Sequence, residues 1–295
     1  MARKIGVDLG GSWVRVGILD PGPDGGTLHV EKYPSPGGWD RLIGLIAPHI
    51  TADVRGVGVA VAGPIENHSL VVKGPNLHWL DGRDVGRDLG AAIGKRVVVS
   101  NDMEAATEGE MARGVLKNYR WTIFDTISTG WGGNLVLDGK RVDGEPGHTN
   151  IRFDSPYRCG CGNYGCNEAH FSGAHMEQRV HEHIADDEGA WQAVNRALQE
   201  NAPWLLALMD DWGEGVGRAW ANVLNRIRPI QAIVYMGTTA EMLMSVARVE
   251  RKLRETIQTI CQFPEHKVES FPILKATEPN RAIYGAITVL DKLMA

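Results

Sequence analysis

Two stretches of this chain follow the same plan: an apolar strand pattern, a glycine turn and a second apolar strand pattern. The first stretch spans residues 5–20 around Gly10-Gly11, and the second spans residues 122–139 around the glycine-rich residues 129–133. β-Branched and apolar residues on both sides of a glycine pair predict a β-hairpin. The repeated plan therefore predicts a molecule built from two halves of similar design.

The rest of the first half alternates helical and strand patterns. Helices are predicted near residues 38–50 and 85–93, and buried strands at 56–62 and 96–100. Strands that alternate with helices indicate an α/β sheet. With 295 residues, 43% of them hydrophobic, the chain can bury one core in each of two lobes.

The second half continues with an irregular loop rich in glycine and cysteine after the second hairpin. Mostly helical sequence is predicted from about 174 to 228, then a strand at 233–236 and a helix after Gly237. Residues 281–294 predict a closing helix. No flexible linker is visible, so we expect short, defined crossings between the lobes and hinge closure.

Charge and hydropathy narrow the possible partners. The formal net charge is −5, and no run of Lys or Arg is present, which argues against a nucleic-acid partner. No stretch approaches the roughly 18 apolar residues of a spanning helix, and the N-terminus lacks an apolar signal core, so we expect a cytoplasmic protein without a membrane partner. Any bound phosphate must then be held by local backbone dipoles and a metal ion.

The first glycine turn is a candidate phosphate site. Its glycines let backbone amides approach phosphate oxygens, and a carboxylate just before it is placed to orient Mg²⁺. The residues are Asp8, Gly10, Gly11 and Ser12. Considered alone, a Gly-Gly pair is more often only a tight turn.

The second glycine turn, which contains Thr129 and Gly130, favours the phosphate-binding interpretation over a simple tight turn. Two matching turns can hold phosphates from both sides of a cleft between matching halves.

Asp102 lies at a predicted junction between a strand and a helix. One interpretation is a carboxylate that caps the helix. The other is a general base, because open α/β sheets bind ligands at the carboxyl ends of their strands, and a carboxylate there can accept the proton of a sugar hydroxyl. The two interpretations are compatible, since phosphoryl transfer depends mainly on positioning.

The strongest local signal is a cluster of metal-ligand residue types. Three thiolates and one imidazole complete a tetrahedral Zn²⁺ shell, a closed arrangement typical of structural zinc. The ligands are His148, Cys159, Cys161 and Cys166. The alternative is a chance cluster of reduced cysteines.

Two glutamates flank this cluster. Zinc would make the loops around Glu145 and Glu168 rigid, and their carboxylates can accept hydrogen bonds from sugar hydroxyls; the alternative is ordinary surface charge. Four nearby histidines lack metal spacing to the cysteines and are predicted at the surface. They are His170, His175, His181 and His183.

Taken together, these motifs resemble the ROK family of bacterial sugar kinases and related repressors, within the actin-like, hexokinase-like ATPase superfamily. The resemblance covers nearly the whole chain. The matching segments are Glu145 to His148, Cys159 to Glu168, Asp8 to Ser12, Asn101-Asp102 with Ala105, Gly63-Pro64 and Pro75-Asn76-Leu77.

The resemblance implies a two-lobed actin-like ATPase fold, also called ribonuclease H-like, with duplicated hairpin domains and a cleft between them. The expected lobes are residues 1–115 with 280–295, and residues 116–279. It implies Asp102 as the base and a homodimer as the oligomeric state.

By the same resemblance, the sugar would be held by Asn76, Asn101, Asp102, Glu145, His148 and Glu168. His148 would serve twice, with one ring nitrogen on zinc and the other toward the sugar. ATP with Mg²⁺ would lie between Gly10 to Ser12, Thr129-Gly130 and the turn at Gly237-Thr238.

Three positions in the second turn depart from the family pattern. Ser128 and Asn134 stand where the second turn usually has glycine, and Trp131 places a bulky side chain in the middle of that turn. We therefore expect the geometry of this phosphate turn to differ.

The expected activity is ATP-dependent phosphorylation of a hexose hydroxyl, glucokinase-like by default. The nearest alternatives are N-acetylmannosamine or N-acetylglucosamine kinases and fructokinases, because single hydroxyl contacts decide among sugars. A sugar-sensing repressor is a further alternative, although no basic helix-turn-helix segment precedes the first hairpin. An inactive sugar-binding protein is the last, and Asp8 and Asp102 argue against it.

Overall fold

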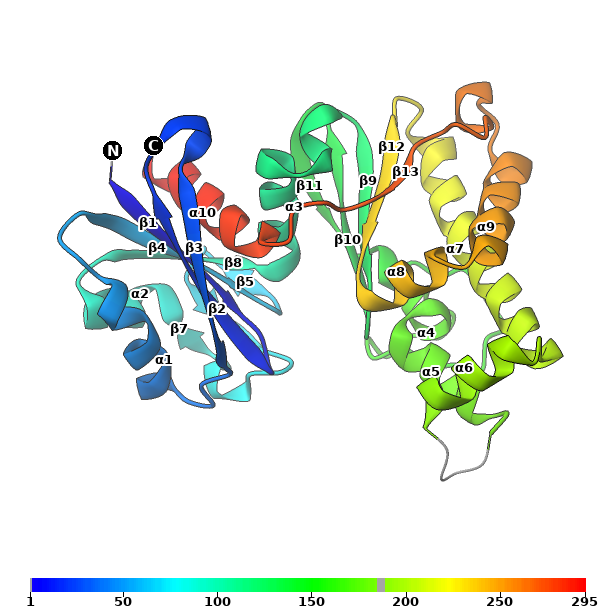
Figure 1. Ribbon diagram of the computed structural model, residues 1–295, viewed down its shortest axis with the longest axis horizontal. Coiled ribbons are helices and arrows are strands. Elements are labelled where there is room, and N and C mark those ends of the chain that lie inside the picture. Colours follow the sequence, from blue (N-terminus) through cyan, green and yellow to red (C-terminus); the bar gives the residue numbers. More distant parts are fainter. Residues whose placement is uncertain (1, 185–188) are drawn as a thin grey trace. The chain divides into compact units, whose positions relative to one another are not determined.

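The computed structural model describes residues 2–184 and 189–295. The chain divides into two compact units (Figure 1). The first unit contains the residues up to Asn118 together with Thr277–Ala295, and the second contains Tyr119–Ala276.

The first unit is built on a five-stranded sheet in the order β3-β2-β1-β4-β8. The strands are β1 (Arg3–Leu9), β2 (Trp13–Asp20), β3 (Thr27–Pro34), β4 (Val54–Val61) and β8 (Arg96–Asn101). β1 and β2 pair antiparallel, which confirms the first predicted hairpin, whereas β1, β4 and β8 run parallel. Alternating Val and Ile side chains of these strands fill the buried core on the sheet.

The register of the parallel strands brings three distant segments to one edge. Leu9 pairs with Val61, and Val61 pairs with Asn101, so β1, β4 and β8 end side by side. The residues that follow each strand therefore share the carboxyl edge of the sheet, where open α/β sheets bind ligands.

Four α-helices complete the first unit: α1 (Trp39–Ile46), α2 (Val85–Ile93), α3 (Asp102–Arg113) and α10 (Arg281–Met294). A small sheet of β5 (Ile65–Glu66), β6 (Leu70–Val71) and β7 (Arg83–Asp84) lies between β4 and α2 in sequence. The helix predicted at 38–50 is α-helical only to Ile46 and ends in a 3-10 turn at Ala47–His49, where Pro48 has no amide hydrogen to donate.

Helices α3 and α10 pack closely against each other; α10 is the red helix in Figure 1. A Cβ at Gly285 would lie 1.6 Å from the Ala105 carbonyl oxygen, and one at Gly109 would lie 1.8 Å from the Arg281 carbonyl oxygen. The missing side chains thus allow backbone-to-backbone contact.

The second unit repeats the plan with a sheet in the order β11-β10-β9-β12-β13. The strands are β9 (Thr122–Ile127), β10 (Trp131–Leu137), β11 (Lys140–Gly144), β12 (Ala232–Met236) and β13 (Ile273–Lys275). β9 and β10 form the second predicted hairpin, and β12 runs parallel to β9.

Helices form the rest of the second unit: α4 (Glu168–Phe171), α5 (Gly173–His181), α6 (Ala190–Gln199), α7 (Pro203–Arg226), α8 (Thr238–Met244) and α9 (Ala247–Ile260). They confirm the predicted helical stretch for the described residues; residues 185–188 of that stretch lie outside them. Across the described ranges, none of the helices has the length and apolar character needed to cross a bilayer.

Candidate active site

The first glycine turn lies at the carboxyl edge of the first sheet. The Gly10 amide donates to the Trp13 carbonyl at 2.9 Å and closes the hairpin. A Cβ at Gly11 would lie only 2.7 Å from the Asn76 Cβ. The fold therefore brings a predicted phosphate residue against a predicted sugar residue that is distant in sequence.

Asp8 has a partner across the same hairpin. Its Oδ2 accepts hydrogen bonds from Arg15 Nε at 3.0 Å and from Arg15 Nη2 at 2.6 Å. The guanidinium fixes the carboxylate at the end of β1 and offsets its charge.

Asp102 is the first residue of α3, and its neighbour performs the capping. Asn101 Oδ1 accepts from the Met103 amide at 2.8 Å and from the Glu104 amide at 3.3 Å, while Asn101 Nδ2 donates to the Gly63 carbonyl at 3.0 Å. The interpretation of Asp102 as the helix cap is therefore wrong, because the cap is the preceding residue, Asn101. The cap at Asn101 leaves Asp102 exposed at the sheet edge, where its Oδ1 also accepts from the Met103 amide at 2.9 Å.

The second glycine turn is closed by a hydrogen bond from the Ser128 amide to the Gly130 carbonyl at 2.8 Å. Two other segments contact it. Ser128 Oγ lies 3.2 Å from Thr238 Oγ1, and the Ser128 carbonyl accepts from Thr239 Oγ1 at 3.2 Å and from the Gly173 amide at 2.6 Å. The structure therefore brings the predicted nucleotide residues of the second unit together.

Gly237 has a steric reason to be glycine. Its φ is +99°, a conformation that other residues rarely adopt, and a Cβ there would lie 2.4 Å from the Ile127 carbonyl oxygen. This close approach lets the turn after β12 lie against the end of β9.

Glu168 links the second turn to the cysteine cluster. Its Oε2 accepts from the Trp131 amide at 2.9 Å, and its Oε1 lies 3.5 Å from Cys159 Sγ. A Cβ at Gly130 would lie 2.8 Å from Glu168 Oε2, so the glycine leaves room for the carboxylate.

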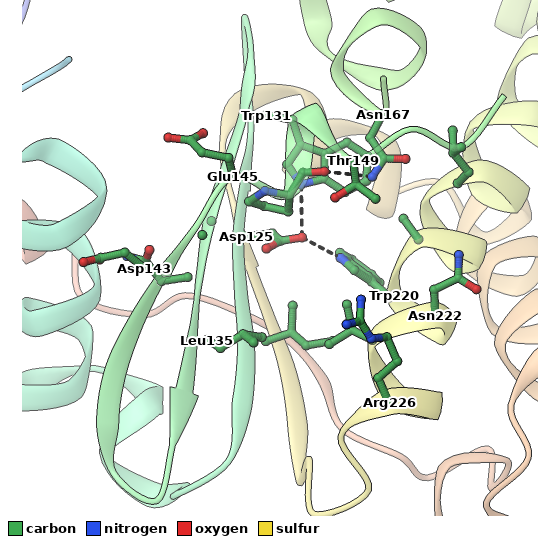
Figure 2. A pocket seen from close by; sticks show the side chains of 18 residues that line it. Asp125, Trp131, Leu135, Asp143, Glu145, Thr149, Asn167, Trp220, Asn222 and Arg226 are labelled. Carbon is green, nitrogen blue, oxygen red and sulfur yellow. Dashed lines mark hydrogen bonds between the residues drawn. The ribbon is translucent and has the colours of Figure 1, made fainter. Parts of the chain in front are cut away.

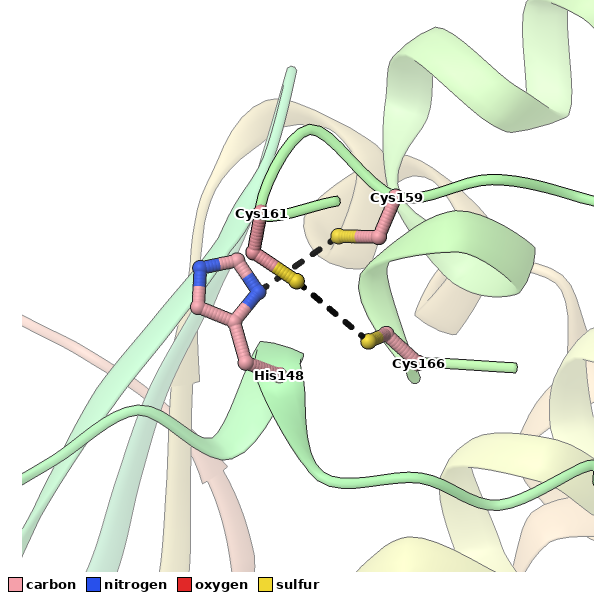
Figure 3. A group of neighbouring side chains, drawn as sticks. All are labelled: His148, Cys159, Cys161 and Cys166. Carbon is pink, nitrogen blue, oxygen red and sulfur yellow. Dashed lines mark hydrogen bonds between the residues drawn. The ribbon is translucent and has the colours of Figure 1, made fainter. Parts of the chain in front are cut away.

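The four predicted metal ligands converge (Figure 3). Their ligand atoms all lie within 4.8 Å of one another in the part of the chain that the structure describes. Cys161 Sγ lies 3.7 Å from Cys166 Sγ, and Cys159 Sγ lies 3.5 Å from His148 Nδ1. Zn–S bonds of about 2.3 Å and Zn–N bonds of about 2.0 Å in a tetrahedron give separations of about 3.7 and 3.5 Å. The donor set and its spacing therefore fit zinc.

The thiols of the cluster differ: burial raises the pKa of Cys159 and Cys166, whereas a backbone hydrogen bond from Asn163 lowers the pKa of Cys161. Burial raises the pKa of the Cys159 thiol to about 12, so without a cation this thiol keeps its proton at neutral pH. A metal that binds here must displace protons.

Glu145 and His148 flank a short turn that rests on the start of β10. A Cβ at Gly147 would lie 2.0 Å from the Trp131 carbonyl oxygen, which explains the glycine between them. Glu145 is exposed. The turn thus joins a predicted sugar residue to a predicted zinc ligand.

Trp131 does not project into the turn as its position in the sequence suggested. The side chain is buried, and its Nε1 donates to Asp125 Oδ2 at 3.0 Å (Figure 2). Trp220 Nε1 donates to the same oxygen at 2.8 Å. Desolvation of the buried carboxyl raises the pKa of Asp125 to about 6, although both indole donors oppose the rise.

No sequence pattern singled out Asp125, which looks like any polar residue in a strand. It lines a cavity of about 250 Å³ between β9, β10 and α7.

A second cavity, also of about 250 Å³, lies among α5, α6, α7 and α8. Its walls are mostly apolar, and Thr239 and Met242 of α8 line it beside the turn at Gly237-Thr238.

One histidine was predicted wrongly. His170 is 1% exposed, and within the described residues neither ring nitrogen has a hydrogen-bond partner. Burial lowers its pKa to about 4, with Arg152 and Arg179 adding to the effect. Its ring packs against Tyr157 and Phe171. The pattern failed because this histidine lies on the inner side of the one-turn helix α4.

The predicted site residues fall into two groups. Asp8, Gly10, Gly11, Ser12, Asn76, Asn101 and Asp102 belong to the first unit, and Thr129, Gly130, Glu145, His148, Glu168, Gly237 and Thr238 belong to the second. Each group lies within its own unit.

A family pattern, a curated relative and solved structures all match most of this chain. The sequence pattern of the ROK family matches residues 4–292. A glucokinase of Streptomyces coelicolor is 32% identical over 228 residues, which cover 73% of this chain and 67% of the relative. The structure of a ROK hexokinase from Thermus thermophilus has a TM-score of 0.81 at 24% identity and covers 99% of this chain and 100% of that one.

A ROK family glucokinase from Streptomyces griseus, solved in complex with glucose and AMPPNP, has a TM-score of 0.71 at 21% identity and covers 97% of this chain and 98% of its own. These structures share the actin-like two-domain α/β fold. Because the family pattern spans nearly all of the sequence, this chain belongs to the ROK family.

Proposed function

We propose that this ROK-family chain is a sugar kinase that transfers the γ-phosphoryl group of ATP to a hexose hydroxyl, with Asp102 as the catalytic base. One observation carries the proposal. Asp102 and the glycine turn at Gly10–Ser12 follow parallel strands that end side by side, at the sheet edge where ligands bind.

In this proposal Asp102 accepts the proton of the attacking hydroxyl and orients that oxygen in line with the phosphoryl group. Phosphoryl transfer passes through a loose transition state and depends mainly on positioning and charge neutralisation, so an ordinary carboxylate is sufficient. Asn101 caps α3 and is tied to the Gly63 carbonyl, which holds the base in place.

The sugar would be recognised by acceptor and donor groups of both units. We assign Asn76, Asn101, Asp102, Glu145, His148 and Glu168 to this role. His148 Nδ1 faces the thiols, which leaves Nε2 for a sugar hydroxyl. Glu168 contacts both the second turn and the cysteine cluster. An ordered cluster would therefore hold the Glu168 carboxylate in a fixed position toward the sugar.

The nucleotide would use both glycine turns. Backbone amides at Gly10, Gly11 and Ser12 and at Thr129-Gly130 would hold the phosphates, and Asp8 would orient Mg²⁺. The turn at Gly237-Thr238 would hold the nucleoside. The apolar cavity beside Thr239 has a suitable size and lining for a flat purine base.

Zinc would be held by His148, Cys159, Cys161 and Cys166. With four protein ligands the metal has no open position, so it would supply rigidity and no catalysis. The sugar residues Glu145 and Glu168 lie next to these ligands in sequence, and their order would depend on the metal.

We further propose a cytoplasmic homodimer whose two lobes close on the sugar. All four cysteines are free thiols, as a reducing compartment requires. The homodimer follows from the family resemblance, and the closure follows from the two-lobe plan with its short crossings.

The direct test is a coupled assay with MgATP and a panel of hexoses, which includes glucose, mannose, fructose and the acetylated amino sugars. We expect turnover with at least one sugar, with glucose as the first candidate. No turnover with any sugar, from a protein that is folded and contains zinc, would overturn the kinase proposal. Sugar binding without turnover would indicate a binding protein instead.

A further inference from the structure

One buried side chain hydrogen-bonds to both chain segments that connect the two units. Glu110, in the third turn of α3, is fully buried at 0% exposure. Its Oε1 accepts from the Val115 amide at 2.9 Å and from the Thr277 amide at 2.7 Å, and its Oε2 accepts from the Glu278 amide at 3.0 Å and from Arg281 Nε at 3.3 Å.

These partners lie where the chain changes units. Val115 begins the short 3-10 helix (Val115–Asn118) after which the second unit starts, and Thr277 is the first residue after the chain returns. A single carboxylate therefore fixes the first-unit ends of both crossings to one helix.

A glycine next to Glu110 leaves room for its carboxylate to reach both segments. A Cβ at Gly114 would lie 2.0 Å from Glu110 Oε1, so a side chain there would displace the carboxylate. Charge-assisted hydrogen bonds to backbone amides are shorter and roughly twice as strong as neutral ones. Removing this acceptor would leave the Val115, Thr277 and Glu278 amides without their charged partner.

The same helix carries the proposed base at its other end. Asp102 is the first residue of α3, and Glu110 follows two turns later on the same rigid element. Any movement of the crossings relative to α3 is a movement relative to Asp102.

We propose that Glu110 is a positioning residue for phosphoryl transfer: it anchors both crossings to the helix that carries Asp102, so that the second unit pivots about a fixed point of that helix. The inference rests on the proposed kinase function. Glu110 touches neither substrate in this proposal, and it acts through the crossings.

Glu110→Gln replaces one acceptor oxygen with an NH₂ group that faces amide donors. We expect kcat to fall by about 10- to 100-fold and the sugar KM to change with it, as is common for hinge residues. Hydrogen exchange should accelerate about tenfold or more in peptides that contain residues 115–118 and 277–278, with the β1 and β4 peptides unchanged.

Glu108→Gln is the matched control. Glu108 is a second buried glutamate of α3, and its Oε2 accepts from Lys292 Nζ of α10 at 2.6 Å, away from the crossings. Its substitution weakens α3 against α10, so we expect kcat within about threefold of wild type and unchanged exchange at both crossings.

Gly114→Ala is a milder second variant in case Glu110→Gln does not fold. The added methyl group pushes on the carboxylate, and we expect the same changes at about a third of the size. Normal kcat with normal exchange in the folded variant would overturn the proposal, as would an equal loss in Glu108→Gln. The exchange measurement needs no turnover, so it tests the anchor even if the kinase proposal fails.

Discussion

The two glycine turns of this protein are held in different ways. The first turn, at Gly10–Ser12, is closed by its own hairpin and braced by Asn76 and by the ion pair of Asp8 with Arg15. The second turn, at 128–130, is bound by side chains and amides from two other segments, and Glu168 connects it to the cysteine cluster. The first turn is therefore held mainly by its own hairpin with one distant neighbour, and the second is tied to the cysteine cluster.

The largest effect should come from the first unit. Asp102→Asn should lower kcat by about 10²- to 10⁴-fold, because the amide cannot accept the hydroxyl proton. The fold should persist, since Asn101 is the cap of α3. The measurement is kcat together with thermal unfolding, and near-normal turnover would remove Asp102 from its role.

Next in size is the loss of zinc, which should affect only the second turn. Cys161→Ser should lose the metal, measured by elemental analysis against about one zinc per chain in wild type, and weaken sugar binding by about 10- to 100-fold. Cys261→Ala is the control, because this buried thiol lies outside the cluster. Metal-free protein with unchanged sugar affinity would contradict the link between the cluster and the sugar.

Glu168→Gln should affect substrate binding less than the loss of zinc does, and it tests whether Glu168 links the second turn to the sugar site. The amide keeps one acceptor for Trp131 but loses the charge, so we expect KM for sugar and for ATP to rise by about 3- to 30-fold with zinc retained. Equal effects on both substrates would support the link through Glu168. A change in the sugar KM alone would limit the residue to the sugar site.

The smallest effect on activity should come from Asp125. Its folded-state pKa of about 6 exceeds that of an unfolded aspartate, so the folded state binds the extra proton. Stability from this group is present at low pH and falls as the pH rises from about 4 to about 6. Asp125→Asn should therefore gain stability relative to wild type over that range, by at most about 3 kcal/mol. Denaturant unfolding at several pH values measures the difference, and a difference that does not vary with pH would refute it.

Local patterns predicted much of this molecule. The first hairpin follows from a glycine pair between apolar runs, whereas the second turns at 128–130 and its Gly132-Gly133 pair lies inside β10. The cysteine spacing together with His148 indicated which side chains would converge. The junction at Asn101-Asp102 was only half predicted, because both residue types cap helices and the sequence does not show which oxygen faces the amides.

The features that the sequence did not reveal depend on contacts between distant segments. In the sequence Glu110 resembles any helical glutamate, and only the fold brings residues 277–281 into hydrogen-bonding contact with it. Asp125 lies on strand β9 and is distinctive only because Trp220 of helix α7 donates to it. His170 resembles a surface histidine for the same reason.

The most direct measurement is a crystal structure of the chain with a hexose and a non-hydrolysable ATP analogue. We predict that a carboxylate oxygen of Asp102 lies about 2.6 to 3.2 Å from one sugar hydroxyl, with that hydroxyl directed at the γ-phosphorus. A sugar bound with every hydroxyl beyond hydrogen-bond reach of Asp102, directly or through one water, would contradict its role as the base.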